Sequence, residues 1–164
     1  MSNTNIRPEE PIDQAAVRAI LRQCFPGPEE AHLVDQLRSR GDAEIMLVAQ
    51  EDGRPVGFVA LSRMRAPFKA LGLAPVAVLP EYRNHGIAAE LILRALADAR
   101  DAGWEGVFVL GDPDYYNRFG FTIEAAQGFN SPFSGPHFMA LALAGDRLPA
   151  SSGAVEYAPA FSEL

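Results

Sequence analysis

The chain has 164 residues, 48% of them hydrophobic and 21% charged, which is typical of one globular domain in water. No apolar run approaches the roughly 20 residues of a membrane-spanning helix, and residues 1–10 lack the basic and then apolar layout of a secretory signal. The formal net charge is −7 and the thirteen arginines stand singly, which disfavours nucleic-acid or membrane binding and favours a cationic substrate such as an amine. A single cysteine excludes an internal disulfide and a cysteine-rich zinc site, so we expect no metal and a cytoplasmic location.

Two helices are predicted near the N-terminus, after a short extended start. Apolar residues recur at four-residue steps over residues 16–24, the spacing of one helix face, and Cys24 is expected to be a small apolar filler of that face. A Pro-Gly-Pro break follows. The second helix then begins at Pro28, with Glu29 and Glu30 in its first turn, and ends at Gly41.

A β-hairpin and a strand–helix–strand unit come next. The Asp52-Gly53 pair is a turn signal between two strand-like segments. The predicted elements are strands at 44–50 and 55–61, a buried strand at 73–79, a helix at 86–100 and a buried strand at 107–110. The crossover between residues 79 and 107 should be right-handed, with its two strands parallel.

The C-terminal part is predicted to be strand-rich. A short helical segment follows residues 111–113, Phe121 and Ile123 open a strand, and residues 138–143 form a last long one. The tail, 146–164, is rich in Pro, Ser, Gly and Ala, and its residues 155–157 would add an edge strand. We interpret residues 1–164 as a single domain with a core at about 6–145, an α/β fold whose mixed central sheet is flanked by helices.

The segment with the clearest chemistry is residues 75–89. It reads as a buried strand, a proline stop and a loop that enters a helix through Gly86. The first turn of a helix has backbone N–H groups without intrahelical partners and carries partial positive charge, so it can bind phosphate or pyrophosphate. Short side chains at Ala88 and Ala89 would let phosphates approach, and Arg83 could donate a charge-assisted hydrogen bond. The alternative is that the small residues only let the helix pack tightly on the sheet.

Two motifs together resemble a known superfamily. The run from Arg83 to Ala88, Arg-Asn-His-Gly-Ile-Ala, is similar to the Arg/Gln-x-x-Gly-x-Gly/Ala acyl-CoA-binding motif of GNAT superfamily N-acetyltransferases. Residues 115–121, Tyr-Tyr-Asn-Arg-Phe-Gly-Phe, resemble the Phe/Tyr-Tyr-x-x-x-Gly-Phe segment of that superfamily. The sequence at 110–113 and the tail at 155–161 resemble one subfamily of small bacterial acetyltransferases. The resemblance covers about residues 6–145.

The resemblance implies a GNAT fold with acetyl-CoA as co-substrate. Backbone amides from His85 to Ala89 would hold the CoA pyrophosphate, and the strand ending at Val78 would splay from the strand at 107–110 to admit pantetheine. The backbone N–H of Val78 would stabilise the thioester oxyanion. The cofactor-binding residues that the resemblance implies are Ala77, Val78, Arg83, Asn84, His85, Gly86, Ile87, Ala88, Ala89 and Tyr115.

Tyr116 occupies the family position of the general acid. A tyrosine, with an unperturbed pKa of roughly 10, is protonated at neutral pH and can donate to a departing thiolate. Its neighbour Tyr115 would pack or line the cofactor channel, and in the alternative interpretation both tyrosines are core aromatics. No general base is evident: Glu29 and Glu30 border the acceptor site in this fold and could bind substrate, or could serve only the helix dipole.

One departure from the family pattern stands at Gly111-Asp112, where many members have an asparagine that contacts pantetheine. Asp112 is expected instead to cap the following short helix, with Pro113 at its first position.

We interpret the chain as an N-acetyltransferase that moves an acetyl group from acetyl-CoA to a primary amine by direct attack in a ternary complex. The alternatives are transfer of a longer acyl group, a CoA-binding regulatory protein without turnover, and a sheet protein with no cofactor. Small amines, aminoglycosides and protein N-termini all qualify as acceptors, and a homodimer is compatible with the resemblance.

Overall fold

The computed structural model describes residues 4–164, and its centre is a six-stranded sheet in the order β1-β2-β3-β4-β5-β7. All neighbouring strands are antiparallel except β4 and β5, which are parallel, so the predicted mixed sheet is confirmed. The strands are β1 (Thr4–Pro8), β2 (Ala43–Glu51), β3 (Arg54–Arg63), β4 (Ala70–Val78), β5 (Gly106–Leu110) and β7 (Phe138–Ala142).

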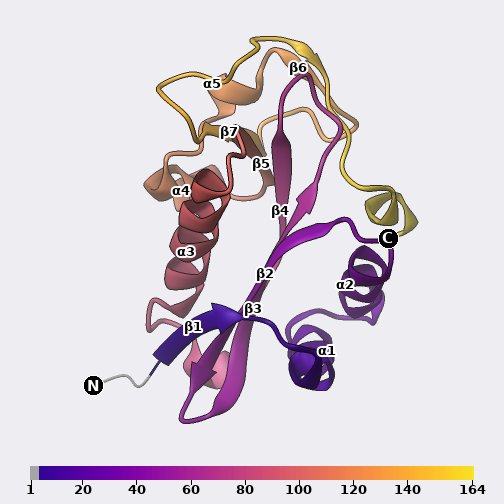
Figure 1. The fold of residues 1–164 in the computed structure, drawn as a ribbon, viewed down its shortest axis with the longest axis vertical. Helices are drawn as coiled ribbons and strands as arrows, with labels where there is room; N and C mark the ends of the chain where they lie inside the picture. The colour runs from indigo at the N-terminus through magenta and orange to yellow at the C-terminus, as the bar shows by residue number, and fades with distance from the viewer. Residues whose placement is uncertain (1–3) are drawn as a thin grey trace.

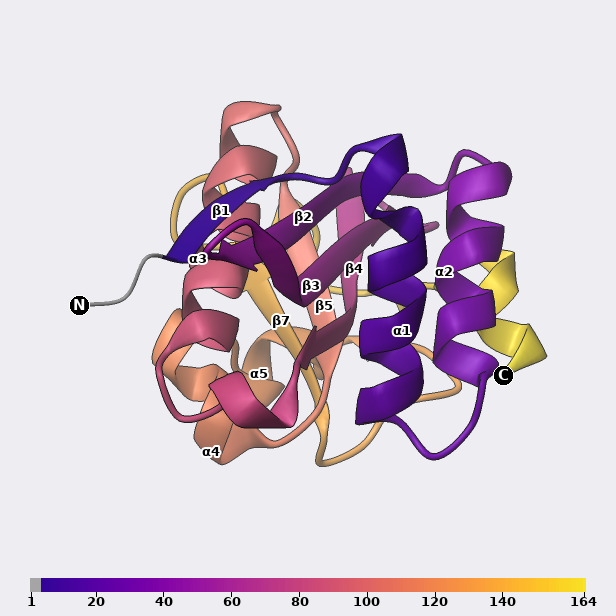
Figure 2. The same ribbon diagram turned by 90° about the horizontal axis from the view of Figure 1, so that it is seen from below.

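Helices cover both faces of this sheet, as predicted. The helices α1 (Gln14–Cys24) and α2 (Glu29–Ser39) lie side by side on one face, and α3 (Ile87–Asp101) lies on the other (Figures 1 and 2). Each helix turns an apolar stripe inward, and the stripe of α3 includes the fully buried Leu91, Ile92 and Ala95. The main core therefore lies in two layers, one on each side of β3.

The turn between β2 and β3 follows the sequence signal. Asp52 and Gly53 have φ angles of 50° and 81°, the left-handed pair of a type I′ turn, which matches the twist of a hairpin. Both strands of the hairpin extend one to two residues beyond the predicted ends.

The strand predicted at Phe121 and Ile123 is wrong. Residues Ile123–Ala126 form a short helix, α5, and Thr122 caps it by accepting a hydrogen bond from the backbone N–H of Ala125 at 3.1 Å. Thr122 also forms a single bridge to Ala140, so the chain touches the sheet for one residue before it turns into the helix. A capping threonine outweighed the β propensity of its neighbours.

The tail packs against the domain, but it does not form the edge strand predicted at residues 155–157. Strand β8 (Gly153–Ala154) pairs with β6 (Phe129–Asn130) in a separate two-stranded sheet, and Glu156 forms one bridge with Arg65. Beyond it, the buried Ala158 and Ala160 pack on α2. The remaining elements are the helix α4 (Pro113–Tyr116) and 3-10 turns at Pro11–Asp13, Pro80–Tyr82, Asn117–Phe119 and Pro159–Glu163.

Within residues 4–164, no helix is both long enough and apolar enough to cross a bilayer.

A buried ion pair fastens β1 to the start of α1. The guanidinium of Arg7 donates to both carboxylate oxygens of Asp13, at 2.7 and 2.9 Å, and the backbone N–H of Glu10 donates to the same carboxylate at 2.7 Å. Asp13 is only 4% exposed. The hydrogen bonds from Arg7 hold the pKa of this carboxyl below its usual value, against the opposing effect of burial.

We therefore expect Asp13→Asn to lower the free energy of unfolding by about 2 kcal/mol at pH 7, the size typical of hydrogen bonds to a charged group. Because the folded pKa is depressed, the stabilisation is complete above the unfolded pKa of about 3.9 and is lost as pH falls through the folded pKa. Urea denaturation at a series of pH values measures this. Asp98→Asn, which breaks the exposed pair with Arg94, should cost at most about 0.5 kcal/mol. A loss at Asp13 that does not shrink in acid would contradict the assignment.

Candidate functional site

The sheet opens between β4 and β5. The two strands pair over only three residues, from Ala70 and Gly106 to Gly72 and Phe108. Beyond this point β4 continues along β3 while β5 continues along β7. The parallel pairing and the splay expected of these strands are therefore both present.

The splay leaves one edge of β4 unpaired. The N–H of Leu79 donates to the carbonyl of Val56 at 2.9 Å, and hydrogen-bonded pairs alternate along an antiparallel ladder. Ala77, two residues earlier, is therefore the next residue bonded to β3. It follows that Val76 and Val78 turn their peptide groups away from β3, toward the opening.

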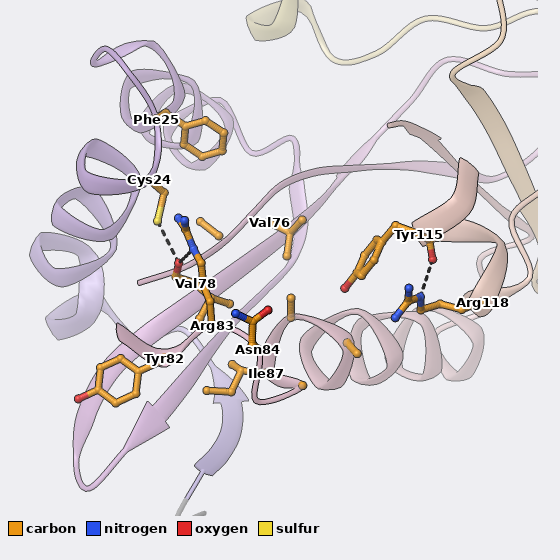
Figure 3. Close-up of a pocket in the computed structure, with 14 residues that line it drawn as sticks. Cys24, Phe25, Val76, Val78, Tyr82, Arg83, Asn84, Ile87, Tyr115 and Arg118 are labelled. Atoms are coloured by element: carbon orange, nitrogen blue, oxygen red, sulfur yellow. Dashed lines mark hydrogen bonds between the residues drawn. The ribbon is translucent and has the colours of Figure 1, made fainter. Parts of the chain in front are cut away.

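A cavity of about 660 Å³ occupies the space between this edge and the start of α3 (Figure 3). Two arginines line it and no carboxylate does, although the chain as a whole has a net charge of −7. Its lining residues are Cys24, Phe25, Val76, Ala77, Val78, Tyr82, Arg83, Asn84, Gly86, Ile87, Ala88, Ala89, Tyr115 and Arg118.

The N-terminus of α3 opens into this cavity. Gly86 is the N-cap residue with φ of +78°, a conformation that favours glycine, and no side chain caps the helix. A Cβ added at Gly86 would meet no atom within 4 Å, so this glycine is not what lets the helix pack tightly, whereas Ala88 does pack against the core. The amides of Ile87, Ala88 and Ala89, at the first three helical positions, have no intrahelical acceptor and lie at the cavity wall.

Two side chains brace the end of β4. The Nε of Arg83 donates to the carbonyl of Val78 at 2.9 Å, and the Sγ of Cys24 donates to the same carbonyl at 3.3 Å (Figure 3). Cys24 is therefore a half-buried hydrogen-bonding residue at the cavity wall and not only an apolar filler of α1.

Tyr115 and Tyr116 point into different spaces. The hydroxyl of Tyr115 points into the first cavity (Figure 3), and the guanidinium of Arg118 lies 4.4 Å from the centre of its ring. Tyr116 lines a second cavity of about 310 Å³. The two rings meet edge to face with centroids 5.1 Å apart, so together they form a partition between the two spaces.

The second cavity lies across the opening from the first and shares Phe25 and Val76 with it. Ten of its thirteen lining residues are apolar, and Glu30 is the one charged side chain among them. The lining is Phe25, Glu30, Leu33, Leu73, Ala74, Pro75, Val76, Leu110, Tyr116, Phe133, Tyr157, Phe161 and Leu164.

The absence of a side chain at Gly111 makes room for Tyr116. A Cβ at this glycine would lie 2.5 Å from Cε2 of the tyrosine ring, a contact that no real structure tolerates without a shift. Asp112 caps α4 through a 3.0 Å bond from the N–H of Asp114, with Pro113 at the first helical position, which confirms the predicted cap. Burial raises the pKa of Tyr116 to about 12, so the hydroxyl keeps its proton at neutral pH.

Most of the predicted site residues come together, with two exceptions. His85 is exposed and lines neither cavity. The carboxylate of Glu29 lies against Gly27, where an added Cβ would meet its Oε2, and lines neither cavity, whereas Glu30 lines the second. Sequence reasoning missed Phe25, Val76, Tyr82 and Arg118 in the first cavity. Of these four residues, only Val76 could have been found from the sequence. Val78 is expected to face the opening between the strands, and alternate residues of a strand face the same edge.

Among the described residues, no three His, Cys, Asp or Glu side chains lie together as metal ligands would.

Comparison with known proteins agrees with this geometry. Residues 15–121 match the model of the acetyltransferase (GNAT) family. The uncharacterized N-acetyltransferase YhbS of Escherichia coli K12 is 37% identical over 97% of this chain and 99% of its own length. The uncharacterized N-acetyltransferase YjhQ of the same strain is 33% identical over 76% of this chain and 73% of its own.

Solved structures give the same result. The crystal structure of Escherichia coli YhbS in complex with CoA superposes with a TM-score of 0.92 at 36% identity, covering 99% of this chain and 93% of that one. A GNAT family acetyltransferase from Brucella melitensis in complex with acetyl-CoA superposes with a TM-score of 0.83 at 35% identity, covering 98% of this chain and 99% of that one. The resemblance drawn from the sequence motifs is thus confirmed, and the chain belongs to the GNAT family of acetyltransferases.

Proposed function

We propose that this chain transfers an acetyl group from acetyl-CoA to a primary amine, with both substrates bound at once. The observation that carries the proposal is the opening between β4 and β5, which joins two cavities of different chemistry at Phe25 and Val76. A reaction by direct attack needs two substrates that meet at one point, and the opening supplies that point.

The first cavity fits coenzyme A. Its volume of about 660 Å³ lies within the roughly 300–1,000 Å³ of ligand cavities. The free amides of residues 87–89 suit the pyrophosphate, and Arg118 at the wall adds positive charge for the phosphates. In an acidic protein, a cavity with two arginines and no carboxylate favours an anion. The complexes of the Brucella relative with acetyl-CoA and of YhbS with CoA support the same ligand.

The unpaired edge of β4 fits the pantetheine arm and the thioester. The peptide groups of Val76 and the N–H of Val78 face the opening, so the amides of an extended ligand can pair with them as a further strand would. The N–H of Val78 would then donate to the thioester oxygen as negative charge develops there. Arg83 and Cys24 hold the carbonyl of the same residue, and this fixes the Val78–Leu79 peptide, the one that follows the donating N–H.

The transfer itself needs one proton moved to sulfur and one removed from nitrogen. The amine nitrogen forms the new bond to the acetyl carbon, the carbon–sulfur bond breaks, and sulfur leaves with the electron pair. Tyr116, protonated at neutral pH, would donate a proton to that sulfur. Glu30 would bind the incoming ammonium and accept the proton whose loss makes it a neutral amine, and the proton that nitrogen loses in the transfer itself would return to the Tyr116 oxygen. The products are an amide and the free thiol of CoA.

Blocking the amides at the start of α3 should abolish cofactor binding. Ala89 is the third helical residue and lines the first cavity. Ala89→Glu places a carboxylate where the phosphates would lie, and we expect at least a 100-fold loss of CoA affinity by calorimetry. Glutamate is favourable in the first turn of a helix, so the fold should keep its stability. Ala97→Glu, on the exposed side of the same helix, is the matched control and should bind CoA normally. Equal affinities of the two variants would contradict the assigned phosphate site.

Removing the Tyr116 hydroxyl should slow the chemical step. We expect Tyr116→Phe to lower kcat by about 10²-fold or more, the usual effect of losing a general acid, with little change in CoA affinity. Thiol release from acetyl-CoA over a panel of amines measures the rate. Tyr115→Phe, beside it but facing the first cavity, should keep most of kcat. An unchanged rate in Tyr116→Phe removes the role assigned to this residue, and CoA binding without turnover of any amine by the wild type would favour a regulatory protein.

The neighbouring residues Glu29 and Glu30 allow a second comparison between a test variant and its control. Glu30 lines the second cavity and Glu29 does not, so Glu30→Gln should lower kcat/KM for the amine at least tenfold while Glu29→Gln has little effect. The factor corresponds to the roughly 1.5–3 kcal/mol of a hydrogen bond to a charged group. Equal losses in both variants would show that the two acids act only through the helix dipole.

A further inference from the structure

The second cavity has an apolar wall that the transfer chemistry does not require. Three of its members, Leu110, Phe133 and Leu164, are 46%, 39% and 58% exposed. Only two other large apolar side chains of the described residues are exposed to this degree, Ile12 and Leu93, and both lie away from it. Exposed apolar side chains normally scatter, so their collection around one cavity marks a binding surface for an apolar ligand.

The tail builds the far side of this cavity. The ring of Tyr157 covers Gly72 of β4, where an added Cβ would lie 2.5 Å from its Cε1. It packs between Phe133 and Phe161, with ring centroids 5.5 and 5.1 Å away. The tail therefore contributes an aromatic wall to a cavity that otherwise lies between α2 and the splayed strands.

A buried hydroxyl in this wall has no partner. The Oη of Tyr157 is buried and makes no hydrogen bond to any part of the described chain. Buried polar groups are nearly always satisfied, and an orphan that lines a cavity is a candidate contact for a ligand. Tyr116 lines the same cavity as Tyr157, so both tyrosines border the space that a ligand would occupy.

From these observations we propose that the acceptor is a small primary amine carrying a compact apolar group, aromatic or branched aliphatic. This rests on the proposed acetyl transfer to an amine. The apolar group packs against Leu33, Phe133 and Phe161, the amine lies toward Val76 and Tyr116, and the Tyr157 hydroxyl supplies a hydrogen bond to it.

The same lining disfavours acceptors with several charges. A polyamine or an aminoglycoside brings two or more ammonium groups, and the cavity offers one carboxylate side chain, Glu30, among ten apolar residues. An ammonium group removed from water without a partner costs several kcal/mol. An apolar group gains about 25 cal/mol for each Å² that it buries.

Calorimetry of amines into the protein saturated with CoA tests this without turnover. The probes are 2-phenylethylamine and 3-methylbutylamine against ethanolamine and 1,4-diaminobutane. We expect both apolar amines to bind at least tenfold more tightly than ethanolamine or the diamine. No binding of the apolar amines, or equal or tighter binding of either polar amine, overturns the inference.

Two variants connect the preference to the cavity. Leu110→Ala should weaken 2-phenylethylamine about threefold, whereas Leu93→Ala, at an exposed leucine on α3 outside the cavity, should not change it. Tyr157→Phe should weaken the amine about tenfold while stability stays the same or rises, because an unpartnered buried hydroxyl contributes nothing favourable to the fold. Equal effects of the two leucine variants, or unchanged amine affinity in Tyr157→Phe, contradict the assigned wall.

Turnover separates this inference from the proposed function. If the apolar amines bind selectively but release no CoA thiol from acetyl-CoA, acetyl transfer fails and the binding preference stands. If thiol release is as efficient with ethanolamine as with the apolar amines, the substrate class fails and acetyl transfer stands.

Discussion

The divergence of β4 from β5 is the constraint on which the site depends. Two parallel strands that remain paired would satisfy each other's peptide groups and leave no space between the helix layers. Because pairing stops after Gly72, the peptide groups of Val76 and the N–H of Val78 stay available, and the two cavities meet at Phe25 and Val76. The interactions on both sides of the opening keep β4 and β5 apart. β3 keeps β4 on one side, β7 keeps β5 on the other, and Arg83 and Cys24 fix the last peptide of β4.

The sequence predicted the first cavity well because its determinants are local. A strand, a stop, a left-handed glycine and a helix start follow one another within residues 75–89, and the backbone of that one segment forms most of the wall. The second cavity joins α2, the splayed strands, residue 133 and the tail, which are distant in the sequence. Nothing in the local pattern of Tyr157 or Phe161 shows that a tail rich in Pro, Ser and Gly returns to cover Gly72. The misassigned strand at 121–123 has a different origin, since a local capping side chain, Thr122, decided the structure there.

The position of Tyr116 explains why this chain has glycine at 111, where many family members have asparagine. An asparagine there would place its Cβ within the ring of Tyr116 as it stands in this chain. The glycine and the tyrosine position are therefore coupled: the ring occupies the space beside Gly111 at the end of β5, where it borders the second cavity and meets Tyr115 edge to face. A glycine at position 111 has no side chain that could contact a ligand. The unpaired peptide groups of β4, across the opening, can make contacts with a ligand instead.

The net charge and the cavity walls act on ligands at different distances. Together they explain how an acidic protein can have two cavities with such different preferences. The charge of −7 sets a field that attracts cations to the surface over roughly a Debye length of 8–10 Å. Inside, selection depends on contact. Arginines without carboxylates favour an anion in the first cavity, and apolar walls with a single carboxylate side chain would favour, in the proposed acceptor site, one ammonium group attached to a hydrophobic body. The overall charge would therefore bring amines near the protein in general, while the wall contributed by the tail would decide which of them fits.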